Sequence, residues 1–100
     1  MPVMVIMEWK GVTPDQYNAA RQLVNWESDP PDGAMLHIAA FDGKKLRITD
    51  VWRSKGDFDS FIKSRLLPGM KPLNIKDNPD VEIHDVLSVF APAYMPRNPD

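Results

Sequence analysis

The sequence predicts a small α+β domain in which two helices cover one face of a four-stranded antiparallel sheet. Three observations support this. Apolar runs typical of strands, and segments whose apolar residues have helical spacing, follow one another in the order β-α-β-β-α-β. An Asp42-Gly43 pair separates two alternating apolar runs, as in a hairpin. Both helical stripes follow an N-cap residue, Thr13 or Ser54. This order is the split βαβ pattern.

The length of the chain favours one domain, which we place at residues 1–90, followed by an extended tail at 91–100. A domain of 100 residues buries only roughly 60 to 65% of the surface that its unfolded chain exposes. The hydrophobic fraction of 43% is generous for that size. We therefore expect apolar surface to be left over for a partner chain or a ligand.

The first strand and the first helix are each indicated by local pattern. Val3 to Trp9 is apolar on both parities, which predicts a strand buried on both faces. Thr13, Pro14 and Gln16 then read as N-cap, first helical residue and the third position of a capping box. We expect this helix to end near Trp26, because a loop rich in proline follows.

The hairpin at residues 37–52 determines which side chains share a face. If Asp42 and Gly43 are the two turn residues, Phe41 pairs with Lys44 and His37 lies across from Ile48. His37 and Asp50 are then diagonal neighbours. The alternation of a strand puts seven residues on one face: His37, Ala39, Phe41, Leu46, Ile48, Asp50 and Trp52.

The second helix and the last strand complete the pattern. Ser54 predicts a helix start, and an apolar stripe at helical spacing follows. We expect Pro68-Gly69 to end this helix. Val81 to Phe90 alternates well enough to be the last strand. No third helix remains for the second sheet face, so a second copy of the chain is the simplest cover.

Charge and composition exclude several classes of function. Twelve basic and fourteen acidic residues are spread along the chain, which argues against nucleic-acid binding. The chain has no apolar run long enough for a membrane span and no recognisable leader, so we expect a cytoplasmic protein. It has no cysteine and lacks the usual nucleotide, serine-hydrolase and zinc-protease motifs.

His37 and Asp50 are the candidate catalytic pair. A carboxylate that orients an imidazole raises its basicity and leaves the other ring nitrogen free to take a proton from an acidic substrate. The alternative is structural: Asp50 bonds to backbone, and His37 is a half-buried polar residue with its hydrogen bonds satisfied.

Aromatic side chains near this pair suggest a binding pocket for a planar apolar molecule. Its expected walls are Trp52, Phe41, Phe58, Phe61 and Ile62; ordinary core packing is the alternative. His84 cannot be assigned to either face, and Arg65 either holds an anion or extends to solvent. No histidine spacing supports a metal site, and we expect none.

The chain resembles the dimeric α/β barrel superfamily, which includes the antibiotic biosynthesis monooxygenase-like domains. The resemblance covers residues 3–90 and rests on the element order and two motifs. These are DG-x-x-L-x-x-x-D-x-W-x-S, with Asp42, Gly43, Leu46, Asp50, Trp52 and Ser54, and F-x-x-F-x-x-x-R-L-x-P, with Phe58, Phe61, Arg65, Leu66 and Pro68.

The resemblance implies a ferredoxin-like fold and a homodimer joined sheet to sheet. It also implies a monooxygenase-like enzyme that needs no metal, flavin or other cofactor. In that mechanism His37 removes a proton from a small aromatic substrate, Asp50 orients His37, Trp52 forms a wall, and the carbanion reacts with O₂. A non-catalytic dimer that binds a small hydrophobic ligand stays open as the alternative, as does an isomerase or lyase with the same base.

Overall fold

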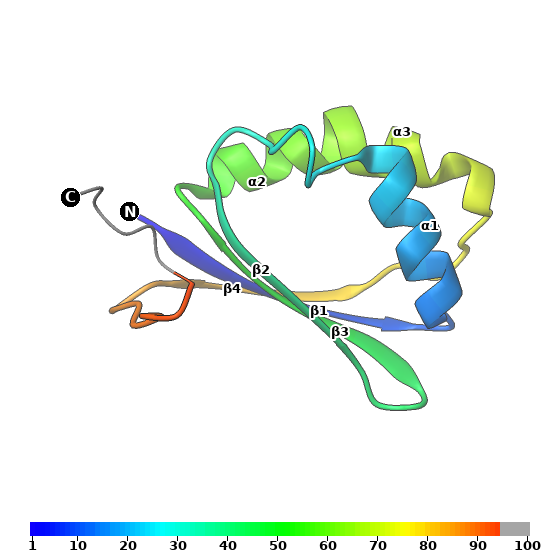
Figure 1. Ribbon diagram of the computed structural model, residues 1–100, viewed down its shortest axis with the longest axis horizontal. Helices are drawn as coiled ribbons and strands as arrows, with labels where there is room; N and C mark the ends of the chain where they lie inside the picture. The colour runs from blue at the N-terminus through cyan, green and yellow to red at the C-terminus, as the bar shows by residue number, and fades with distance from the viewer. Residues whose placement is uncertain (95–100) are drawn as a thin grey trace.

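The computed structural model describes residues 1–94 and has the predicted α+β, ferredoxin-like fold (Figure 1). Its four strands form one antiparallel sheet in the order β2-β3-β1-β4, and the helices lie on one face of it. The elements are β1 (Val3–Lys10), α1 (Pro14–Val24), β2 (Ala34–Phe41), β3 (Lys45–Trp52), α2 (Lys55–Phe61), a π-helical turn (Ile62–Leu66), α3 (Leu67–Met70), a 3₁₀ turn (Lys71–Leu73) and β4 (Asp80–Asp85).

The core lies between the sheet and the helices. Alternate residues of β1 are buried on the helix side, namely Val3, Val5, Met7 and Trp9. The residues between them are half-buried, so the prediction of a first strand buried on both faces is wrong for the single chain. Within residues 1–94 no helix covers the second face of the sheet.

The first helix begins as predicted. The Thr13 hydroxyl accepts a hydrogen bond from the Gln16 amide at 3.1 Å, and the Gln16 side chain accepts one from the Thr13 amide at 2.9 Å. The helix ends at Val24, two residues before the predicted Trp26, because Asn25 adopts a left-handed conformation with φ of 62°. Trp26 therefore belongs to the loop that leads to β2.

The hairpin register differs from the prediction. Phe41 pairs with Leu46, so His37 lies directly opposite Asp50 and not diagonal to it. Gly43 and Lys44 are the central turn residues. The shift is an even number of residues, and the predicted set of side chains on the helix face is therefore preserved.

Asp42 explains the shifted turn, since its Oδ1 accepts hydrogen bonds from the amides of Lys44 and Lys45, both at 2.9 Å. Asp42 is thus the first of the four residues of the turn. The next residue, Gly43, then takes the left-handed position with φ of 93°.

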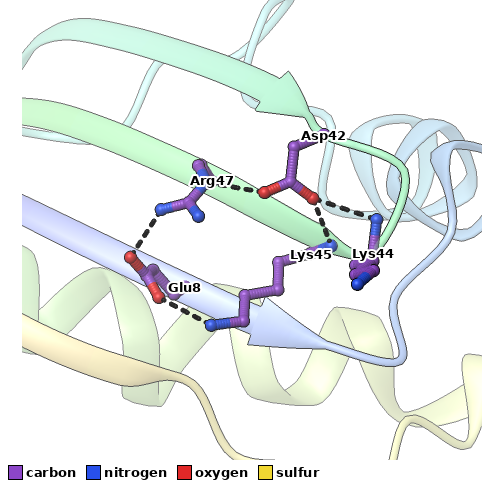
Figure 2. A network of polar contacts seen from close by, with 5 residues as sticks. All are labelled: Glu8, Asp42, Lys44, Lys45 and Arg47. Carbon is purple, nitrogen blue, oxygen red and sulfur yellow. Dashed lines mark hydrogen bonds and ion pairs between the residues drawn. The ribbon is translucent and has the colours of Figure 1, made fainter.

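A polar network ties the hairpin to β1 on the open face of the sheet (Figure 2). Arg47 donates to Asp42 at 3.0 Å and to Glu8 at 2.6 Å, while the Lys45 ammonium lies 3.4 Å from Glu8. The backbone amides of Lys45 and Lys44, followed by the Arg47 guanidinium, lower the pKa of Asp42 to about 2. The network joins the turn, β3 and β1 at one end of the sheet.

The second helical segment starts after Ser54 as predicted, but Pro68-Gly69 does not end it. A π-helical turn precedes Pro68, which then falls in the first turn of α3, where a missing amide hydrogen is tolerated. A Cβ on Gly69 would lie 2.7 Å from Cγ2 of Val24. Glycine at this position therefore allows α3 to pack closely on α1.

The last strand is shorter than the predicted Val81 to Phe90. Within residues 1–94, β4 pairs with β1 alone, and it ends at Asp85 because β1 begins at Val3. One further bond joins the Val86 amide to the Pro2 carbonyl at 3.0 Å. Leu87 and Phe90 beyond it are 100% and 89% exposed. Of the predicted tail, residues 92–94 form a turn and residues 95–100 lie outside the described residues.

Candidate functional site

A chain of three side chains crosses from α1 to the sheet. The Tyr17 hydroxyl lies 2.7 Å from Nε2 of His37, and Nδ1 of His37 lies 2.7 Å from Oδ1 of Asp50. Tyr17 comes from α1, His37 from β2 and Asp50 from β3. The direct opposition of His37 and Asp50 in the hairpin makes this contact possible.

Asp50 is a buried carboxylate whose two oxygens both have partners. It is 5% exposed, and its Oδ2 accepts a hydrogen bond from the Trp52 indole nitrogen at 3.1 Å. Burying a charged group is costly unless it is paired and hydrogen-bonded. The contacts to His37 and Trp52 meet that requirement through side chains and not through backbone.

The sequence predicts that the second ring nitrogen of His37 is free to take a proton. In the structure this nitrogen is not free, because the Tyr17 hydroxyl lies within hydrogen-bond distance of it. Burial raises the pKa of Tyr17, and the nearby charges of Glu27 and Asp50 raise it further while Arg21 opposes them. A carboxylate can only accept a hydrogen bond, so Nδ1 of His37 donates to Asp50. In the neutral imidazole Nε2 is then the acceptor, and the Tyr17 hydroxyl donates to it.

Aromatic rings surround the imidazole. The Tyr17 ring stacks on the His37 ring, with ring centroids 6.1 Å apart and planes 8° from parallel. The centroid of the Trp26 ring lies 5.3 Å from the centroid of the His37 ring. Sequence reasoning missed both as site residues. Tyr17 has the helical spacing of the apolar residues Ala20 and Val24, which indicates core packing and not a site. Trp26 reaches the imidazole only because α1 ends at Val24.

A small cavity of about 70 Å³ lies beside this chain, between the sheet and the helices. His37, Asp50, Trp52 and Phe61 are on its wall, as the sequence predicts for a pocket. The wall also contains residues that the sequence did not indicate as site residues, among them Trp9, Tyr17, Trp26, Pro31 and Met70.

The other three residues predicted to bind substrate are not on this wall. Phe58 is buried but packs its ring against Trp52, with centroids 5.8 Å apart. Ile62 packs against the core from the π-helical turn, and Phe41 is 40% exposed at the end of β2. Phe41 shares a face with His37 but is four residues further along the strand.

The structure places the two residues that the sequence left unassigned. His84 pairs with Met4 and so lies on the open face, away from the cavity. Arg65 donates to the Val24 carbonyl at 3.0 Å and stands over the Phe61 ring at 5.7 Å. A cation there stabilises the carbonyl end of α1.

Neither a metal cluster nor a membrane-spanning helix is found in the described part of the chain. Residues 1–94 contain no group of three or more histidine and acidic side chains placed to hold an ion. Their helices are also too short and too polar to cross a bilayer.

Comparison with known proteins identifies the fold. No family model and no curated protein matches the chain. Among solved structures, an antibiotic biosynthesis monooxygenase-like protein of Chloroflexus aurantiacus is 13% identical with a TM-score of 0.67, covering 91% of this chain and 98% of that one.

Two further solved structures are similar to this chain in fold. A protein of Mycobacterium tuberculosis is 20% identical with a TM-score of 0.62, covering 91% of this chain and 100% of that one. SnoaB, a cofactor-independent oxygenase of Streptomyces nogalater, is 11% identical with a TM-score of 0.63, covering 88% and 94%. The chain therefore has the fold of the antibiotic biosynthesis monooxygenase-like proteins.

Proposed function

We propose that this protein is a cofactor-independent monooxygenase-like enzyme that acts on a small aromatic substrate with an acidic methylene group. The observation that carries the proposal is the Tyr17–His37–Asp50 chain on the wall of an apolar cavity. A base next to an apolar pocket is what proton removal from a weakly acidic carbon requires. The likeness in fold to SnoaB supports the same reading.

The substrate proton moves along the chain of side chains. The Tyr17 oxygen accepts it while the Tyr17 hydroxyl passes its own proton to Nε2 of His37. Asp50, held by Trp52, stabilises the imidazolium that forms. Tyr17 is thus the group that touches the substrate, and His37 is the base behind it.

The substrate carbanion then reacts with O₂. Formation of a carbon–oxygen bond gives a peroxide anion, which takes back the stored proton to become a hydroperoxide. The hydroperoxide then loses water to leave a carbonyl group. A methylene and one O₂ become a carbonyl and one H₂O, so the substrate itself supplies all the electrons.

The size of the cavity restricts how a substrate binds. At about 70 Å³ it is less than half of the roughly 150 Å³ of an engineered apolar cavity that binds benzene. An aromatic substrate therefore needs the wall to move. Trp26 and Pro31 belong to the loop between α1 and β2, and loops are the segments that most readily give way.

The test is O₂ uptake by the purified protein with a panel of small cyclic aromatic ketones that have an acidic methylene group. We expect His37→Ala to lower the rate at least about a hundredfold. His84→Ala is the matched control, since this histidine lies on the open face. Equal rates for His37→Ala and the wild type would refute the role of His37.

A protein that binds a small hydrophobic ligand without turnover is the second candidate, and the apolar wall of the cavity supports it. In that case aromatic compounds bind, but no compound of the panel is oxidised, and His37→Ala changes affinity alone.

A homodimer joined through the open sheet face is part of the proposal. Ile38 on that face is 53% exposed, and Met4 and Ile6, on the same face across β3, are only half-buried. Sedimentation should give twice the chain mass of 11.4 kDa, and Ile38→Asp should shift it towards the monomer. A wild-type monomer at micromolar concentration would contradict this.

A cytoplasmic location fits the absence of cysteine.

A further inference from the structure

The cavity beside the proton-transfer chain has two kinds of wall. Its outer wall includes half-buried or exposed residues of the loop after α1 and of the start of β2, namely Trp26, Pro31 and Ala34. Its inner wall includes buried residues of α1, β3 and α3, namely Ala20, Leu46, Ile48 and Met70. The cavity therefore has an outer part near solvent and an enclosed inner part.

The inner wall adjoins the groups that move the proton. Ala20 follows Tyr17 by three residues, so the two lie on the same side of α1. Ile48 precedes Asp50 by two residues in β3, so their side chains share a face of the sheet, and both are buried. The inner part of the cavity is thus next to the place where the substrate loses its proton.

The inner part suits a small apolar molecule better than water. A buried water needs about two to four hydrogen-bond partners, whereas an apolar cavity stays dry and takes up apolar probes such as xenon. Ala20, Leu46 and Ile48 offer hydrocarbon alone. The polar groups of His37 and Asp50 are already hydrogen-bonded to each other and to neighbouring side chains. A volume of about 70 Å³ is too small for an aromatic ring but large enough for a diatomic molecule.

We propose that the inner part of the cavity is a binding site for O₂, which lies there against Ala20, Ile48 and Met70. O₂ is apolar and, like xenon, gains free energy on leaving water for an apolar cavity. The inference deepens the proposed function and rests on it for the use of the bound O₂, but not for its binding. The aromatic substrate then occupies the outer part, where the loop gives way, and its carbanion forms next to O₂ that is already bound.

NMR of the methyl-labelled protein tests the binding without any substrate. O₂ is paramagnetic and speeds the relaxation of nearby methyl protons, so spectra under O₂ are compared with spectra under the same pressure of nitrogen. We expect faster relaxation for the methyl groups of Ala20, Ile48 and Met70 than for those of Val5, and we expect added xenon to reverse the effect. Val5 is 0% exposed but is not on the cavity wall. Equal relaxation at Val5 would overturn the inference, because O₂ would then dissolve throughout the core.

Ala20→Val fills part of the inner cavity, and Ala39→Val is the matched control. Ala39 is partly buried against the core and is not on the cavity wall. We expect Ala20→Val to reduce the effect of O₂ on the Ile48 methyl groups about fourfold, the factor that corresponds to one methylene-sized apolar contact. The control should keep the full effect. An unchanged effect in Ala20→Val would contradict the site. If this variant does not fold, the comparison with Val5 in the wild type decides alone.

The use of the bound O₂ has its own readout. With a ketone that the wild type oxidises, Ala20→Val should raise the KM for O₂ about fourfold and leave the binding of the ketone under nitrogen within about twofold. An unchanged KM for O₂ would show that the reacting O₂ comes from elsewhere. If no ketone is oxidised by the wild type, the proposed function fails, and the relaxation of the methyl groups still decides whether the cavity binds O₂.

Discussion

The Tyr17 hydroxyl and Nε2 of His37 are 2.7 Å apart, although the two residues belong to a helix and an edge strand and are twenty positions apart in the chain. This contact changes the chemistry of the site. With Asp50 alone, His37 would present a bare nitrogen to the cavity. Because Tyr17 is hydrogen-bonded to that nitrogen, a substrate in the cavity contacts the phenol instead. Nε2 of His37 is already in position to accept the proton of the phenol.

The ionisation of Tyr17 should be delayed on alkaline titration. Burial raises its pKa, so the folded state is favoured while the phenol is neutral and loses that advantage as the pH rises through the Tyr17 pKa. The ultraviolet absorbance of tyrosinate should show a late step that Tyr17→Phe removes. An unchanged titration in the variant would contradict the contact.

Asp50→Asn should destabilise the protein and change the tautomer of His37. The amide can orient only one oxygen, so either His37 or Trp52 loses its acceptor. We expect unfolding in urea to show a loss of about 1 to 3 kcal/mol. Nitrogen chemical shifts of the imidazole report whether Nδ1 still carries the proton. A variant with unchanged stability and tautomer would show that Asp50 does not hold the ring.

Gly69→Ala should be destabilising, unlike most such changes in helices. The new methyl group would lie 2.7 Å from Cγ2 of Val24, a stiff and buried side chain. The expected net loss is about 1 kcal/mol, since overpacking outweighs the gain in helix propensity.

Gly56→Ala is the matched control for Gly69. Its nearest neighbour would be the Ser54 hydroxyl oxygen at 3.8 Å, so only the gain in helix propensity remains, and stability should rise. Urea denaturation compares the two variants. A stabilising Gly69→Ala would refute the close packing of α3 on α1.

Acid should weaken the hairpin within a defined range. The pKa of Asp42 is lowered from 3.8 to about 2, so the stability it supplies is present above pH 3.8 and is lost as the pH falls towards about 2. Thermal melting across this range should show a smaller decrease in Asp42→Asn than in the wild type. Parallel curves would contradict the network that Asp42 forms with the turn and with Arg47.

Local patterns predicted much of this fold. The capping box of Thr13 and Gln16, the order of elements and the alternation of the hairpin all depend on neighbours in sequence, and the structure confirms them. The turn was misplaced because the Asp-Gly pair does not reveal that the Asp42 carboxylate bonds two following amides.

The rest of the site depends on packing between distant segments. Tyr17 meets His37 because of the rotation of α1 over the edge strand, and Trp26 joins them because Asn25 ends that helix.

The central claim is that Tyr17, His37 and Asp50 act as one proton-transfer unit. Its most direct test compares the O₂ uptake of Tyr17→Phe, His37→Ala and the variant with both changes, on one substrate of the panel. Residues that act together give a double variant about as slow as the slower single one. We predict this result. Wild-type rates in either single variant, or losses that multiply in the double variant, would contradict the account.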